Sequence, residues 1–176
     1  MSVLYVVACG GRPGSDLPSF IEYCQNRSWD VCVIATPSGM KFIDPARLKD
    51  LTDHTVRHDY KQPDEPDVLP PPDAFVVAPA TFNTVNKWAA GISDTLALGL
   101  LNEAVGLGLP LICVPWPNRA LAKHPAFTAS VARLKQWGVK FIFDPELYPL
   151  PVPNMGIAGN SLYPWEALRK AVAEIR

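Results

Sequence analysis

The sequence has few charged residues for its length and almost no excess of either sign. Of its 176 residues 19% are charged, the formal net charge is −1, and lysine and arginine form no dense cluster. Proteins that bind nucleic acid carry a basic face that attracts phosphates, so we expect no nucleic-acid partner. The hydrophobic fraction of 48% predicts one folded domain over residues 1–176 rather than a disordered chain.

Cysteine is also scarce, and the sequence has only Cys9, Cys24, Cys32 and Cys113. No two of them have the C-x-x-C spacing of common zinc sites. The histidines show no convergent spacing either, so we expect no metal site; they are His54, His58 and His124. The cysteines in apolar runs are interpreted as buried, reduced thiols, which is typical of a cytoplasmic protein.

Several signatures of other protein classes are missing. The first apolar run, residues 3–8, has no basic flank and is too short for an export signal or a membrane span, so we expect no membrane partner. There is no G-x-S-x-G motif of serine hydrolases and no Walker loop. The first glycine-rich loop is not G-x-G-x-x-G, and no acidic residue ends the second apolar run to hold a dinucleotide ribose.

Proline, in contrast, is abundant. The 19 prolines are about twice the usual share, with five in residues 63–72 and five in residues 145–164. Proline lacks the amide donor and restricts the preceding residue. Both stretches are therefore predicted to be long ordered loops within one domain.

Apolar runs and helical patterns alternate along the chain. Buried strands are predicted at residues 3–8, 31–35, 74–78, 111–114 and 139–143, with a polar edge strand at 55–60. Helices are predicted at residues 15–26, from 44–45, at 84–106 with a break near 91–94, at 125–137, and from 164. This order predicts a doubly wound α/β domain with a mostly parallel six-stranded sheet, Rossmann- or flavodoxin-like.

Ligands bind such sheets at the carboxyl ends of the strands, which directs attention to the loops at 9–16, 36–42, 79–84 and 115–124. Gly10, Gly11, Gly14 and Ser15 lead into a helix N-terminus, where free amides attract an anion such as a mononucleotide phosphate. A plain glycine turn with a helix cap explains this loop equally well. In the segment 79–84, Asn83 and Thr84 are ordinary cap residues. Taken alone, this segment could therefore be a helix cap or a ligand-binding loop.

The residues that follow this segment favour a ligand-binding role over a simple helix cap. The pattern Asn83-Thr84-x-x-Lys87-x-Ala89-x-Gly91-Ile92-x-Asp94-x-Leu96 resembles the signature of the homo-oligomeric flavin-containing cysteine decarboxylases. Thr36-Pro37-Ser38 and Pro115-x-x-Asn118 are similar to two further motifs of that family. The resemblance spans residues 3–143. It implies an FMN cofactor contacted by Gly10, Gly11, Ser15, Thr36, Ser38, Thr81, Phe82, Asn83, Thr84 and Trp116.

The resemblance also implies a small-molecule or peptide substrate, with Asn118 holding its carboxylate, and a homotrimer or a multiple of three. The family's catalytic histidine, however, would fall at Glu65, and His58 lies seven residues further upstream. No cysteine follows Cys113 to reduce an enethiol product. We therefore expect an FMN-binding flavoprotein without the histidine at its usual place.

Other interpretations stay open at this point. The chain could be a peptidyl- or phosphopantothenoyl-cysteine decarboxylase, or a non-catalytic flavin-binding subunit. A flavin prenyltransferase ranks lower because only Arg119 and Lys123 supply basic groups near the second motif. Trp88 is interpreted as core or subunit interface, Asp94 as a helix cap, and His124 as a helix entrance or a pocket wall.

Overall fold

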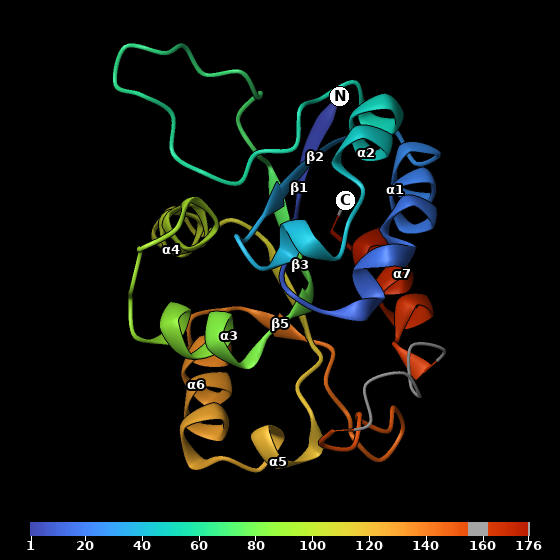
Figure 1. Ribbon diagram of the computed structural model, residues 1–176, viewed down its shortest axis with the longest axis vertical. Coiled ribbons are helices and arrows are strands. Elements are labelled where there is room, and N and C mark those ends of the chain that lie inside the picture. Colours follow the sequence, from blue (N-terminus) through green and yellow to red (C-terminus); the bar gives the residue numbers. More distant parts are fainter. Residues whose placement is uncertain (155–161, 176) are drawn as a thin grey trace.

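The computed structural model describes residues 1–154 and 162–175. Its described part contains one parallel sheet of five strands in the order β2-β1-β3-β4-β5 (Figure 1). The strands are β1 Ser2–Ala8, β2 Trp29–Ala35, β3 Ala74–Ala80, β4 Leu111–Pro115 and β5 Lys140–Phe141. The doubly wound α/β fold is thereby confirmed, in the flavodoxin-like strand order.

The prediction of six strands was wrong by one among the described residues. Residues 55–60 make a single parallel bridge between Arg57 and Ile34 at the edge of β2. The amide of Arg57 donates to the carbonyl of Val33 over 3.1 Å, and the amide of Ala35 donates to the carbonyl of Arg57 over 2.8 Å. The segment extends no further because only Val56 in it is buried, so little apolar surface holds it to the sheet.

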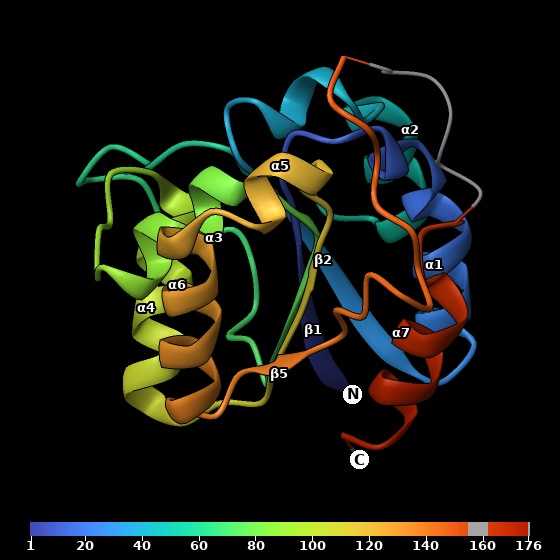
Figure 2. The same ribbon diagram turned by 90° about the horizontal axis from the view of Figure 1, so that it is seen from below.

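Helices cover both faces of the sheet (Figure 2). One face carries the side chains of α1 Leu17–Gln25, α2 Pro45–Thr52 and α7 Trp165–Ala173. The other face carries α3 Phe82–Ala89, α4 Leu96–Leu107 and α6 Pro125–Gln136. The described residues also form two 3-10 turns, η1 Arg12–Asp16 and η2 Gly39–Lys41, and a short helix, α5 Arg119–Ala122. Continuous apolar strands are what burial between two helical layers requires.

The predicted break in residues 84–106 separates α3 from α4. Thr81 caps α3 by accepting from the amide of Thr84 over 3.2 Å, and Thr95 caps α4 by accepting from Leu98 over 3.3 Å. The interpretation of Asp94 as the cap was therefore wrong: its carboxylate instead forms an ion pair with Lys87. Trp88 is completely buried in the core, as one of its two interpretations held.

The first proline-rich stretch is part of a long loop between α2 and β3 that runs beside α4 (Figure 1). Side-chain hydrogen bonds hold it at three points. Asp73 accepts from the amide of Val3 over 2.7 Å, and the hydroxyl of Tyr5 donates to the carbonyl of Pro70 over 2.9 Å. The hydroxyl of Tyr60 lies 3.1 Å from the carbonyl of Thr95. These contacts attach the loop to β1 and to the start of α4.

The second proline-rich stretch lies partly outside the described residues. Residues 145–154 form turns and irregular backbone, and β5 is limited to two residues of the predicted 139–143. No helix in the described part of the chain is long and apolar enough to cross a membrane.

Candidate functional site

The direction in which strands are added to the sheet reverses between β1 and β3. After β1 the chain adds β2 on one side, and it then crosses to add β3 on the other side of β1. A crevice opens at the carboxyl ends of strands at such a point, and flavodoxin-like folds bind their ligand there. Two backbone hydrogen bonds fix the loops around it. The amide of Thr36 donates to the carbonyl of Ala8 over 2.9 Å, and the amide of Cys9 donates to that of Pro79 over 3.1 Å.

A cavity of about 490 Å³ lies at this crevice, within the usual size range of small-molecule sites. It brings together six of the residues for which we predicted cofactor contact: Gly10, Thr36, Ser38, Thr81, Asn83 and Thr84. They come from the loops after β1, β2 and β3 and from the first turn of α3. The remaining lining residues are Pro37, Phe42, Lys87, Thr95 and Leu98.

Two glycines allow the loops after β1 and β2 to approach each other. A Cβ atom on Gly10 would lie 3.0 Å from the Cβ of Ser38 and 3.6 Å from the ring of Phe42. A Cβ atom on Gly39 would overlap the carbonyl oxygen of Ala8. Larger residues at either position would push the Ser38 loop away from β1 and change the shape of the cavity.

Thr36 holds the second loop in place. Its side chain is 7% exposed, and its hydroxyl oxygen accepts from the amide of Gly39 over 3.0 Å. Its carbonyl accepts from the amide of Met40 over 3.1 Å. The hydroxyl of Ser38, by comparison, lies in an exposed residue at the cavity wall, available to a ligand.

The N-terminus of α3 forms the opposite wall of the cavity. The hydroxyl of Thr81 donates to that of Thr84 over 3.0 Å while accepting from its amide. The amides of the first helical turn that Thr81 does not cap favour an acceptor or an anion in front of them. Beneath this turn, burial raises the pKa of the Cys9 thiol to about 11, although hydrogen bonds from Thr84 and Thr81 oppose that rise. Cys9 is therefore a neutral thiol at physiological pH rather than a nucleophile.

Lys87 was part of the motif but not of the predicted site, and it lines the cavity one helical turn beyond Asn83 and Thr84. Its ammonium group pairs with Asp94, which lies in the break between α3 and α4. The spacing of three and four residues on one helix face could have identified it. Thr95 and Leu98 were missed because their place beside the cavity depends on how α4 packs.

The other predicted cofactor residues do not line this cavity. Gly11 packs against Pro79, and the Ser15 hydroxyl donates to the carbonyl of Arg12 over 3.0 Å. The ring of Phe82 stacks on Phe127, with centroids 6.0 Å apart. The ring of Trp116 meets that of Tyr163 edge-on at 5.2 Å, on the side of the sheet covered by α1 and α7. Their role in cofactor binding stays a prediction.

The two candidate catalytic residues lie on separate loops. The side-chain oxygen of Asn118 caps α5 by accepting from the amides of Ala120 and Leu121, both over 3.0 Å. Its side-chain amide makes no hydrogen bond to a described residue. His58 is exposed in the long loop, and neither residue lines the cavity described above.

Two residues near His58 and Asn118 in the sequence, Glu65 and His124, have clear structural roles. Glu65, at which the resemblance would place the family histidine, accepts from the amide of Gln62 over 3.0 Å, in an exposed turn. His124 caps α6 by accepting from the amide of Ala126 over 3.1 Å, and its ring meets Phe82 edge-on. His124 thus serves as the helix entrance, the first of its two interpretations.

These residues fit a flavin mononucleotide. The cavity combines hydroxyl groups, the free amides of a helix start and one cation at its wall, which suit a phosphate and the polar edge of a ring. Glycine at position 10 leaves the backbone accessible from the cavity. The described residues around it offer no carboxylate other than that of Asp94, which Lys87 already neutralises.

The chain is similar in sequence to several named proteins. It is 33% identical over 125 residues to the coenzyme A biosynthesis bifunctional protein CoaBC of Bacillus subtilis, covering 68% of this chain and 30% of that one. It is 28% identical over 120 residues to a probable phosphopantothenoylcysteine decarboxylase of Streptococcus mutans, covering 65% and 66%. The chain thus spans about a third and just under two thirds of these relatives.

Among solved structures, the FMN-dependent cysteine decarboxylase SpaF superposes with a TM-score of 0.70 at 21% identity, covering 99% of this chain and 97% of that one. The resemblance inferred from residues 79–96 is confirmed by these matches. The model of the family described as "Flavoprotein" matches residues 15–175, so the chain belongs to the flavoprotein family.

Proposed function

We propose that the chain binds FMN in the cavity at the carboxyl ends of β1, β2 and β3. The observation that carries the proposal is that one cavity gathers six of the ten predicted cofactor residues. The switch point of the sheet is where this fold class holds its ligand. The FMN-dependent name of SpaF adds support from a protein of the same fold.

Within this proposal, the phosphate lies against Gly10 and Ser38, and the polar edge of the ring lies against the start of α3 at Thr81 and Thr84. Lys87 lies at the same wall, where its ammonium group pairs with Asp94. Four predicted cofactor residues do not line the cavity, so they would contact the cofactor only where it extends beyond the cavity: Gly11, Ser15, Phe82 and Trp116.

The chemistry that we propose is that of the cysteine decarboxylases, on a small molecule or peptide with a terminal cysteine. FMN would supply the two-electron acceptor that oxidises the cysteine side chain before carbon dioxide leaves. The side-chain NH₂ group of Asn118 makes no hydrogen bond to a described residue, and it would donate to the substrate carboxylate. His58 is the histidine nearest in sequence to the family position.

The position of Glu65 limits this activity. The Glu65 carboxylate is exposed and accepts a hydrogen bond from Gln62 within its own turn. A catalytic base has to be positioned beside the reacting group, and Glu65 is not held in this way. We propose that the chain does not complete the conversion of phosphopantothenoylcysteine. A non-catalytic flavin-binding subunit is the second candidate, because the cavity residues are kept while the acid–base position is changed.

We also propose assembly as a homotrimer or a multiple of three, in the cytoplasm. The stretch of residues 88–105 is more apolar than one sheet face requires, which favours a subunit interface. Much of it nevertheless lies in the chain's own core, where Trp88, Leu96, Leu98 and Leu101 are buried. Ile92 and Leu107 are exposed by 42% and 66%, and they leave apolar surface for a partner copy.

The experiment that tests the proposal is a binding titration with FMN, riboflavin and FAD followed by flavin fluorescence. The proposal predicts tight, saturable binding of FMN and much weaker binding of riboflavin, which lacks the phosphate. Equal affinity for riboflavin and FMN would contradict the phosphate site.

A further inference from the structure

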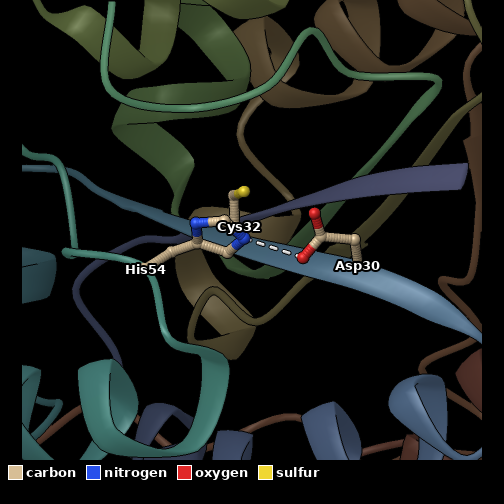
Figure 3. A group of neighbouring side chains, drawn as sticks. All are labelled: Asp30, Cys32 and His54. Carbon is tan, nitrogen blue, oxygen red and sulfur yellow. Dashed lines mark hydrogen bonds and ion pairs between the residues drawn. The ribbon is translucent and has the colours of Figure 1, made fainter. Parts of the chain in front are cut away.

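A second group of reactive side chains lies at the edge of the sheet, away from the cavity. Asp30 and Cys32 project from β2, and His54 follows α2 in the chain (Figure 3). One ligand-type atom from each side chain, an oxygen, a sulfur and a nitrogen, lies within 4.8 Å of the other two. The spacing of these residues in the sequence did not indicate this group, and no metal site was expected from the histidines and cysteines.

The geometry follows from the strand and from the turn after α2. Residues 30 and 32 are two apart on one strand, so their side chains project from the same face. The backbone of His54 is held by Thr52, whose hydroxyl oxygen accepts from the His54 amide over 3.2 Å. That hydroxyl also donates to the carbonyl of Leu48 over 2.8 Å, which anchors the turn to α2. The imidazole is thereby directed at β2.

A hydrogen-bond contact accounts for two of the three residues. The Nε2 atom of His54 lies 2.7 Å from the carboxylate of Asp30, and the two side chains are 21% and 24% exposed. The contact between His54 and Asp30 leaves the role of Cys32 open. Its thiol is completely buried beside them and makes no hydrogen bond to a described residue. Sulfur, imidazole nitrogen and carboxylate oxygen together are the donor set that zinc uses in proteins.

We propose that Asp30, Cys32 and His54 bind one zinc ion, with water as the fourth ligand. A tetrahedral zinc ion with bonds of about 2.0–2.3 Å holds its ligand atoms roughly 3–4 Å apart. Rotation of the partly exposed Asp30 and His54 side chains provides the small adjustment needed. On binding, the ion replaces the thiol proton, which passes to solvent, and forms a bond to the Cys32 sulfur; no redox step occurs.

The zinc ion would tie the edge strand β2 to the start of the long loop between α2 and β3. Binding to the folded chain alone stabilises it by mass action. The test uses the full-length chain, reduced and treated with chelator. We expect titration calorimetry with Zn²⁺ to give one site per chain, elemental analysis to confirm one zinc, and the melting temperature to rise with added Zn²⁺.

Variants make the assignment specific. His54→Gln and Asp30→Asn alter partly exposed side chains, so both should fold. Each should weaken Zn²⁺ binding by at least about 100-fold, since loss of a ligand exceeds the ~10–100-fold cost of losing a group that only orients one. Cys32→Ser should weaken it as much and abolish the thiolate-to-metal absorption band that Co²⁺ gives in wild type. The control His58→Gln, from the same loop, should bind as wild type does.

Absence of stoichiometric Zn²⁺ binding by the wild-type chain would overturn the proposal. So would undiminished binding by His54→Gln, which remains decisive even if Cys32→Ser fails to fold. None of these readouts depends on flavin, so the zinc proposal and the proposed function fail independently.

Discussion

The α-carbon of Gly39 lies so close to the carbonyl oxygen of Ala8 that no Cβ atom fits between them. This contact joins the loop after β2 to the end of β1, and the amide of Gly39 donates to the hydroxyl of Thr36 on the same loop. The shape of the cavity at Gly10 and Ser38 therefore depends on a residue that does not itself line it.

The first prediction concerns this contact. Gly39→Ala should reduce flavin binding at least about tenfold and destabilise the fold by roughly 1–3 kcal/mol, because the added methyl group forces the backbone to shift. Fluorescence titration and urea unfolding measure the two effects. Gly106→Ala is the matched control: a Cβ atom there has open space, so α4 should become slightly more stable and flavin binding should not change. Equal flavin affinity in the two variants would refute this account of the loop.

The second prediction places the phosphate. Ser38→Asp puts a negative charge at the exposed cavity wall beside the proposed phosphate, so flavin affinity should fall by at least about tenfold without unfolding. Asn83→Trp should weaken binding by filling the cavity at the start of α3. Ser28→Asp, at the amino end of β2, is the control. Full flavin occupancy in both the Ser38 and Asn83 variants would show that the site lies elsewhere.

The main features of the fold follow from sequence because apolar runs and helix breakers act locally. Gly91, with a φ of +70°, ends α3 where the sequence predicted a break. The side-chain partners that form the sites are less predictable, since they depend on packing between distant elements. Trp116 turned out to pack against Tyr163, and Asp94 to pair with Lys87 rather than cap a helix.

The edge of the sheet was the least predictable region. Residues 55–60 have the polar character of an edge strand, but whether they pair with β2 depends on how the loop after α2 returns, and only Arg57 does. The same loop path brings His54 to Asp30 and Cys32. No spacing rule predicts from the sequence that a histidine 22 residues beyond a cysteine lies beside it.

The third prediction concerns alkaline pH. Burial raises the pKa of Cys9 to about 11 from the ordinary 9, so the unfolded chain loses this proton at lower pH than the folded chain does. The free energy of unfolding should therefore fall by about 1.4 kcal/mol per pH unit from this group as pH rises from about 9 toward 11. Urea unfolding of wild type and Cys9→Ala at pH 7 and pH 10.5 measures it. The variant should lose less stability; an equal loss in both proteins would contradict the assignment.

The fourth prediction concerns catalysis. We expect no 4′-phosphopantetheine from phosphopantothenoylcysteine, because the resemblance would place the family histidine at Glu65 and no cysteine follows Cys113 to reduce the product. Loss of a positioned acid or base costs about 10²–10⁴-fold in rate. Mass spectrometry of the holoprotein incubated with this substrate, and with a peptide ending in cysteine, gives the answer.

The two outcomes of that assay differ in mass. Loss of carbon dioxide alone would show complete decarboxylation and contradict the prediction. Loss of carbon dioxide with two hydrogens from the peptide would identify an oxidative decarboxylase that stops at the enethiol. His58→Gln, Glu65→Gln and Asn118→Ala would then separate the candidate acid–base residues from the residue that holds the carboxylate.

The fifth prediction tests the central claim most directly, through the visible spectrum of the purified protein. If the cavity at the carboxyl ends of β1, β2 and β3 holds FMN, the protein is yellow, shows flavin absorbance, and releases FMN rather than FAD on denaturation. A colourless protein that also fails to bind added FMN would contradict the account.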